Sequence, residues 1–120
     1  MRVLLILLFC SPAVAQDAPR YVSAEGHTYE YSLNDHGGVL TSVWPVARFL
    51  GFGAGTTVER GTETIYLGRD CDAFSEHLGY GTWGWANGGF GVEFDDGAEV
   101  GFPRQELLPL PTREDFGCRF

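Results

Sequence analysis

Histidine, aspartate and glutamate are the residues of this 120-residue sequence that most often bind metal ions or transfer protons. The three histidines, His27, His36 and His77, do not share the short fixed spacing of zinc ligands. The acidic residues likewise form no Asp-x-Asp-x-Asp-Gly segment, which is typical of a calcium loop. We therefore expect neither a metal ion nor another cofactor.

Nucleophilic catalysis has equally little local support. Ser75 lies two residues before His77, but the sequence contains no Gly-x-Ser-x-Gly nucleophile elbow. Sixteen acidic residues allow many carboxylate pairs for glycoside hydrolysis, so no particular pair stands out. A triad could still assemble from residues that are distant in sequence. The sequence nevertheless favours a protein that binds a partner over one that catalyses a reaction.

Residues 81–94 combine two tryptophans with five glycines. Asn87-Gly88 predicts a two-residue hairpin turn, because a type I′ turn needs positive φ at both central positions. Counting outward from this turn gives the pairs Ala86–Gly89, Trp85–Phe90, Gly84–Gly91, Trp83–Val92 and Thr82–Glu93.

A second turn at Asp95-Asp96-Gly97 leads into a third strand. A three-residue loop ending in Gly97 places apolar residues opposite apolar residues, whereas a slip by one residue would turn every side chain to the other face. The sequence therefore predicts a three-stranded antiparallel meander over about residues 81–103. One of its faces carries Trp83, Trp85, Phe90, Val92, Phe94, Val100 and Phe102.

We expect this aromatic face to be buried, because a continuous apolar face more often belongs to a core. Two indoles and three phenyl rings are enough to organise the core of a domain of this size. The alternative is a platform on which Trp83 and Trp85 stack against a glycan. That alternative requires both indoles to be exposed.

The opposite face of the meander lacks side chains at three neighbouring positions. The predicted register places Gly84, Gly91 and Gly101 side by side across the three strands. Glycine inside a strand costs about 0.5–1 kcal/mol relative to alanine, so we expect a contact with the bare backbone that offsets this cost. We favour an aromatic side chain from the N-terminal half over a partner molecule. The candidates for this side chain are Trp44, Tyr29, Tyr31 and Phe52.

Charged residues flank these glycines. Glu93 faces Glu99, and such a like-charge pair is destabilising unless it is solvated or bridged by a cation. Arg104 follows the third strand and could bind these two carboxylates or the carboxylate of a partner. The sequence favours the internal salt bridge.

The remaining elements must position this meander. Alternating residues predict a first hairpin over 27–33 and 39–44. Residues 45–50 should form a helical turn or, next to the glycines at 51, 53 and 55, a loop. We expect a second hairpin from residues 56–59 and 62–67, and a helical turn over 70–79 with Asp72 as its N-cap. The tail from Pro103 should be irregular up to Cys118.

The N-terminus predicts an export signal. Arg2 precedes an apolar run over residues 3–9, and Ala13-Val14-Ala15 is typical of a cleavage site. Lipid attachment at Cys10 is less favoured, because Phe9 stands where a small residue is needed. Cleavage after Ala15 would leave one domain, residues 16–120, in the periplasm or outside the cell. The apolar run is shorter than the ~20 residues that cross a bilayer, so we expect no transmembrane segment in the mature chain.

Export would also determine how the cysteines are paired. Cleavage removes Cys10 and leaves Cys71 and Cys118, which are most simply paired in an oxidising compartment. This disulfide would span 47 residues and, in the chain-entropy model, stabilise the fold by about 4 kcal/mol.

Charge restricts the classes of partner. Without Arg2 the net charge is −9, and the chain contains no lysine. Such a domain repels phosphate backbones, so nucleic acid and anionic membranes are poor partners, whereas cationic proteins are better ones. The simpler interpretation is that the charge keeps an exported monomer soluble.

The segments Cys71–Ser75, Trp83–Phe90 and Gly101–Gln105 resemble small exported bacterial proteins of no assigned function. The size, signal, single disulfide and β character are more distantly similar to periplasmic lysozyme inhibitors. The Ser-Gly-rich inhibitory loop of that family has no clear counterpart here, so no residue role carries over. We expect an all-β domain, a small antiparallel barrel or sandwich with one disulfide, that serves as a binding or envelope-associated protein.

Overall fold

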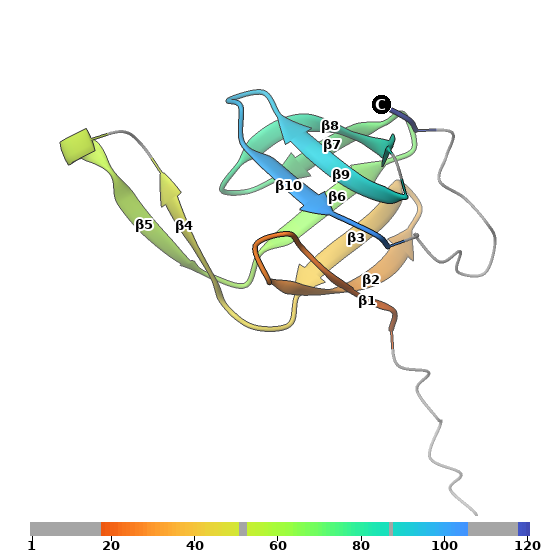
Figure 1. The fold of residues 1–120 in the computed structure, drawn as a ribbon, viewed down its shortest axis with the longest axis horizontal. Coiled ribbons are helices and arrows are strands. Elements are labelled where there is room, and N and C mark those ends of the chain that lie inside the picture. Colours follow the sequence, from red (N-terminus) through yellow and green to blue (C-terminus); the bar gives the residue numbers. More distant parts are fainter. Residues whose placement is uncertain (1–17, 51–52, 87, 106–117) are drawn as a thin grey trace, which may run out of the picture.

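The computed structural model describes residues 18–50, 53–86, 88–105 and 118–120, and an antiparallel sheet of eight strands dominates it (Figure 1). The strand order is β1-β2-β3-β6-β7-β8-β9-β10, and the sheet curls into a nearly closed barrel. The predicted all-β class is confirmed, and of the two predicted architectures, a barrel or a sandwich, the structure has the barrel. The strands are β1 (Arg20–Val22), β2 (Thr28–Asn34), β3 (Gly37–Ser42), β6 (Thr64–Gly68), β7 (Asp72–Ser75), β8 (Gly79–Ala86), β9 (Gly89–Phe94) and β10 (Glu99–Phe102).

The first and last strands of this sheet meet without a regular ladder. The backbone N–H of Ala24 donates to the carbonyl of Gly101 at 2.8 Å. The side-chain amide of Gln105 accepts from the N–H of Val22 at 2.7 Å and donates to the carbonyl of Val22 at 2.6 Å. These two bonds imitate the pairing that a further strand residue would make, so Gln105 helps to close the barrel.

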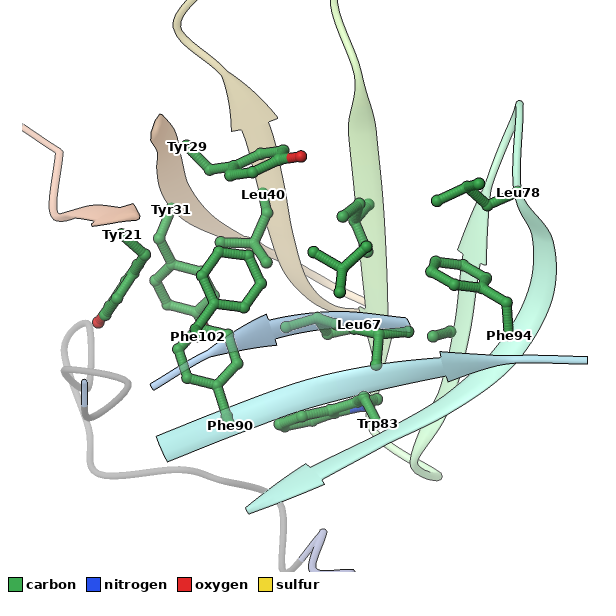
Figure 2. Packing of buried hydrophobic residues seen from close by; sticks show 14 of the residues in the cluster. Tyr21, Tyr29, Tyr31, Leu40, Leu67, Leu78, Trp83, Phe90, Phe94 and Phe102 are labelled. Atoms are coloured by element: carbon green, nitrogen blue, oxygen red, sulfur yellow. The ribbon is translucent and has the colours of Figure 1, made fainter. Parts of the chain in front are cut away.

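The apolar face of the meander lies inside the barrel, as predicted (Figure 2). The side chain of Trp83 is 2% exposed, and its Nε1–H donates to the carbonyl of Gly68 at 2.8 Å. Phe90 stacks on Phe102 with ring centroids 4.5 Å apart and meets Tyr21 of β1 edge-on at 5.3 Å. These contacts join the two ends of the sheet across the interior.

The meander has the predicted register. Ala86 pairs with Gly89 and Trp83 with Val92, which makes the first connection two residues long. Asn87 lies outside the described residues, and Gly88 has a φ of +80°. In the second turn Gly97 has a φ of +97°, and the N–H of Phe94 donates to the carbonyl of Ala98 at 2.8 Å. The three-residue loop is therefore confirmed.

The first hairpin is also confirmed. Strands β2 and β3 pair from Tyr29–Ser42 to Asn34–Gly37, with a two-residue connection. The side-chain oxygen of Asn34 accepts from the N–H groups of His36 and Gly37 at 2.8 and 3.0 Å. This is the local Asx bonding that makes Asn common at such turns.

Three expectations for the middle of the chain are wrong. Residues 46–50 of the segment expected to be a helical turn or loop form strand β4 (Val46–Leu50), and a 3-10 turn, η1 (Gly53–Gly55), comes after it. Strand β5 (Thr57–Gly61) pairs with β4, while β6 pairs with β3 and β7, so the expected second hairpin does not form. The segment 70–79 contains strand β7 instead of a helical turn, because Ala73 and Ser75 face the core and pair with neighbouring strands.

The Cys71–Cys118 disulfide is confirmed, with Cα atoms 5.4 Å apart. It brings the C-terminal residues against β8. The N–H of Trp85 donates to the carbonyl of Cys118 at 2.9 Å, and the N–H of Phe120 donates to the carbonyl of Trp85 at 3.0 Å. The tail over 106–117 lies outside the described residues, as does the predicted signal.

Strands β4 and β5 form a two-stranded arm that projects from the barrel (Figure 1). A hairpin of this kind is only marginally stable by itself in water. A buried ion pair joins its base to the barrel. The guanidinium of Arg48 donates to both carboxylate oxygens of Glu63 at 2.7 and 2.8 Å, and to Glu25 at 2.8 Å. The hydroxyl of Tyr29 donates to the same Glu63 carboxylate.

These contacts maintain the charge states of the three buried groups. Burial by itself would raise the pKa of Glu63, but hydrogen bonds from Arg48 and Tyr29 outweigh it and hold that pKa below its ordinary value of 4.5. Hydrogen bonding to Glu63 raises the pKa of Arg48 against the effect of burial. Burial, together with the bond to Glu63, raises the pKa of Tyr29. Glu63 is thus ionised, Arg48 is charged and Tyr29 is neutral.

We predict that Glu63→Gln lowers the free energy of unfolding by about 3–5 kcal/mol, because it leaves the buried Arg48 without its main partner. Glu25→Gln is the matched control. Glu25 bonds to the same guanidinium, but its side chain is 49% exposed, so its loss should cost no more than about 1 kcal/mol. Urea unfolding at neutral pH measures both. Equal losses in the two variants would contradict the role assigned to Glu63.

The lowered pKa of Glu63 also predicts an acid dependence. Its contribution is fully present above the unfolded-state value near 4.5 and is lost as the pH falls through the lower folded-state value. Unfolding measured from neutral pH to below pH 4 should therefore show a shallower acid decline in Glu63→Gln than in the unmodified protein. Parallel acid declines would refute this.

Candidate binding site

The outer face of β7–β10 carries most of the residues that the sequence singled out. Gly84 pairs with Gly91, and Gly91 pairs with Gly101, so the three glycines do lie side by side. A row of polar residues, three of them acidic, runs parallel to them. Glu99 pairs with Glu93, Glu93 with Thr82, and Thr82 with Asp72.

One end of the glycine row is covered by the chain itself. A β-carbon on Gly84 would lie 3.0–3.1 Å from the backbone atoms of Arg119. The occupant is therefore the C-terminal backbone held by the disulfide, and not an aromatic side chain. Of the expected aromatic residues, Tyr29 and Tyr31 lie in the core, Trp44 is 61% exposed, and Phe52 is outside the described residues.

The other end of the glycine row is open. A β-carbon on Gly101 would have no atom within 4 Å, and one on Gly91 would make only ordinary contacts with β10. The open end belongs to a hollow of about 470 Å³, a volume within the range of ligand sites. The exposed residues of its lining, which we call its rim, are Ala24, Ala86, Glu93, Glu99, Pro103, Arg104 and Phe120.

The carboxylates at the rim have no counter-charge in the described part of the chain. Glu93 and Glu99 are exposed and face each other, and neither forms an ion pair with another described residue. The expected salt bridge from Arg104 is not formed. Arg104 is exposed and has a φ of +57°, which is uncommon for a residue other than glycine. Two like charges thus remain directly opposite each other, an arrangement that destabilises a strand pair.

The two tryptophans do not form a shared platform. Trp83 is buried beneath the sheet, so its ring is unavailable for stacking on a glycan. Trp85 is half-buried, and its ring packs on Phe90 with centroids 5.8 Å apart.

The structure also places the candidates for metal binding and for nucleophilic catalysis. Within residues 18–50, 53–86, 88–105 and 118–120, no group of three or more His, Cys, Asp or Glu side chains could hold a metal ion. Ser75 is fully buried, so its hydroxyl is not accessible as a nucleophile. No helix in the described part of the chain has the length and apolarity needed to cross a membrane.

The arm and the ion pair at its base were not predicted from the sequence. Phe49 and Val58 face each other on the arm and are 75% and 44% exposed. Arg48 lies two residues after the buried Val46, and Glu63 lies two residues before the buried Ile65, so a charge at an inward position of a strand could have indicated a buried pair. Comparison of the chain with models of protein families, with curated proteins and with solved structures finds no match.

We predict opposite effects of adding a methyl group at the two ends of the glycine row. Gly84→Ala should lower the free energy of unfolding by about 1–3 kcal/mol, because the Arg119 backbone lies between a disulfide and a hydrogen bond to Trp85 and has little room to move. Gly101→Ala should be neutral or stabilise by up to about 1 kcal/mol, since its β-carbon enters open space. Denaturant unfolding of both variants measures this. If Gly101→Ala lowered the free energy of unfolding as much as Gly84→Ala does, the space above Gly101 would be filled and not open.

Proposed function

We propose that this protein is an exported, non-catalytic binding protein that captures a cationic protein on the outer face of β8–β10. The observation that supports this most directly is the facing pair Glu93 and Glu99 beside the open glycine floor. An arginine or lysine from a partner, placed between the two carboxylates, would replace repulsion with two charge-assisted hydrogen bonds.

The surroundings of this pair favour a polypeptide partner. Gly91 and Gly101 leave the strand backbone bare, so a partner chain can approach it closely. Arg104 on the same rim offers a cation to a carboxylate of the partner, which would fix the orientation of the bound segment. The net charge of −9 expected for the chain without its signal would attract a cationic protein over a distance and speed its association.

The proposed location follows from the first residues and the cysteines. Residues 1–15 have the pattern of a cleaved signal, which would place residues 16–120 in the periplasm or outside the cell. The Cys71–Cys118 disulfide is typical of proteins that fold in such oxidising compartments.

Cationic cell-wall hydrolases such as lysozyme are the partner class that we favour. They are present where an exported protein would be found, and their charge is complementary to the acidic rim. The likeness in size, single disulfide and β character to periplasmic lysozyme inhibitors points to the same class. Inhibition would follow if the captured surface borders the substrate cleft of the hydrolase.

We predict that the double variant Glu93→Gln/Glu99→Gln binds a cationic lysozyme about tenfold more weakly and shows a smaller dependence on salt. The control is Asp35→Asn/Glu59→Gln, which changes the net charge equally at exposed positions outside the hollow. Association and dissociation rates at low and physiological salt should show that the loss lies mainly in association. Binding that is absent from the unmodified protein, or equally weakened in both double variants, would rule out this function for the hollow.

A further inference from the structure

A row of three aromatic side chains crosses the outer surface of β6, β7 and β8. Tyr66 pairs with Phe74, and Phe74 pairs with Tyr80. The ring centroids are 6.3 Å apart in the first pair and 4.8 Å apart in the second. Tyr80 is 70% exposed and Tyr66 45% exposed, so this aromatic row is separate from the core.

A polar cavity adjoins the aromatic row. Its volume is about 190 Å³, which is smaller than the ~300–1,000 Å³ of sites for drug-sized ligands and suits a single small ring. Tyr66 and Phe74 line it on the aromatic side. The remaining lining residues are Thr62, Thr64, Ser75, Glu76 and His77.

The aromatic row lies on the outer face of the sheet, where its rings do not contribute to the core. In a sheet with one face in the core, the outward positions are normally polar. Here three consecutive strands present rings at neighbouring outward positions, and contiguous exposed apolar surface is typical of binding sites. The sheet itself is already closed around its own core on the other face.

We propose that the aromatic row and the adjoining cavity bind a linear, neutral oligosaccharide. A pyranose ring has an apolar C–H face and a rim of hydroxyl groups. The two exposed rings at the ends of the row, Tyr66 and Tyr80, provide stacking surfaces for a chain of sugars, and the half-buried Phe74 packs between them. The threonine hydroxyls, the His77 imidazole and the Glu76 carboxylate provide donors and acceptors for the hydroxyl rim of one sugar unit.

Charge restricts the class of saccharide. Glu76 lines the cavity, and Asp72 lies two residues from Phe74 on the same face of β7, so an anionic sugar would be repelled. A lysine or arginine side chain could also contact the rings. The cavity favours the sugar, because hydroxyl groups outnumber carboxylates in its lining.

This site is distinct from the proposed protein-binding hollow and from the tryptophan platform that the sequence suggested. The aromatic row lies one row of residues away from Glu93 and Glu99 on the sheet, since Tyr80 and Thr82 are neighbours on the same face of β8. The hollow and the polar cavity share no lining residue, so the two sites can be tested separately.

The test is calorimetric titration of the mature protein with three tetrasaccharides: a β-1,4-linked glucose tetramer, a β-1,4-linked N-acetylglucosamine tetramer, and an anionic galacturonate tetramer. We expect at least one neutral tetramer to bind and the anionic one to bind at least tenfold more weakly. Tyr80→Ala and Tyr66→Ala should each weaken the neutral ligand about tenfold. Phe49→Ala, which removes an equally exposed ring from the arm, should not change its affinity.

Several results would overturn the proposal. The first is that neither neutral tetramer binds. The second is that Tyr80→Ala leaves saccharide binding unchanged. The third is that a lysine-rich peptide binds at these rings while the saccharides do not. Tyr80 is the decisive position, because its exposure means that truncation should leave the unfolding transition unchanged. If the double variant Glu93→Gln/Glu99→Gln still binds the saccharide, saccharide binding does not depend on the hollow. The saccharide site would then be supported even if the hollow binds no cationic protein.

Discussion

The alternation of side chains across paired strands is the constraint on which the rest of this structure depends. In the meander the three-residue loop at Asp95–Gly97 determines the register, and the register decides which side chains enter the core. With Trp83 and its aromatic neighbours inside, the glycines and the facing glutamates must lie outside. The hollow and the aromatic row are thus consequences of the same pairing that builds the core.

Local turn chemistry made part of this fold predictable. Asn34 and Gly97 each specify their turn through their own backbone or side-chain preferences, and the strands beside them alternate clearly. The strand pairing in the middle of the chain was harder to predict, because β3 pairs with β6, and the whole arm lies between them in the sequence. No residue near Gly61 signals that the chain leaves one sheet for another. Asp72 resembles a helix cap locally, but long-range pairing of β7 on both sides outweighs that preference.

The candidate site was predictable to a similar extent. The row of Gly84, Gly91 and Gly101 follows from counting residues, whereas its occupant depends on where the disulfide places the C-terminal backbone. Arg104 has the charge and the sequence position for a salt bridge with Glu99, yet it forms no ion pair with a described residue, and nothing in the local sequence indicates its φ of +57°. The aromatic row could not be recognised, because the sequence placed Tyr66 in a second hairpin and Phe74 in a helical turn, and left Tyr80 just outside the predicted meander.

Glu63 differs from Glu93 and Glu99 in its burial and in the charges around its carboxylate. Glu63 is buried, and the chain surrounds it with a guanidinium and a phenol that keep it ionised and attach the arm to the barrel. Glu93 and Glu99 are exposed and face each other, with no cation from the described part of the chain between them. Solvent reduces their repulsion but leaves it unfavourable, and either residue could be replaced without disturbing the core. The described residues do not offset the cost of this pair, and a cation that arrives from outside would offset it, so we propose the acidic rim of the hollow, and not the arm, as the surface that binds the partner.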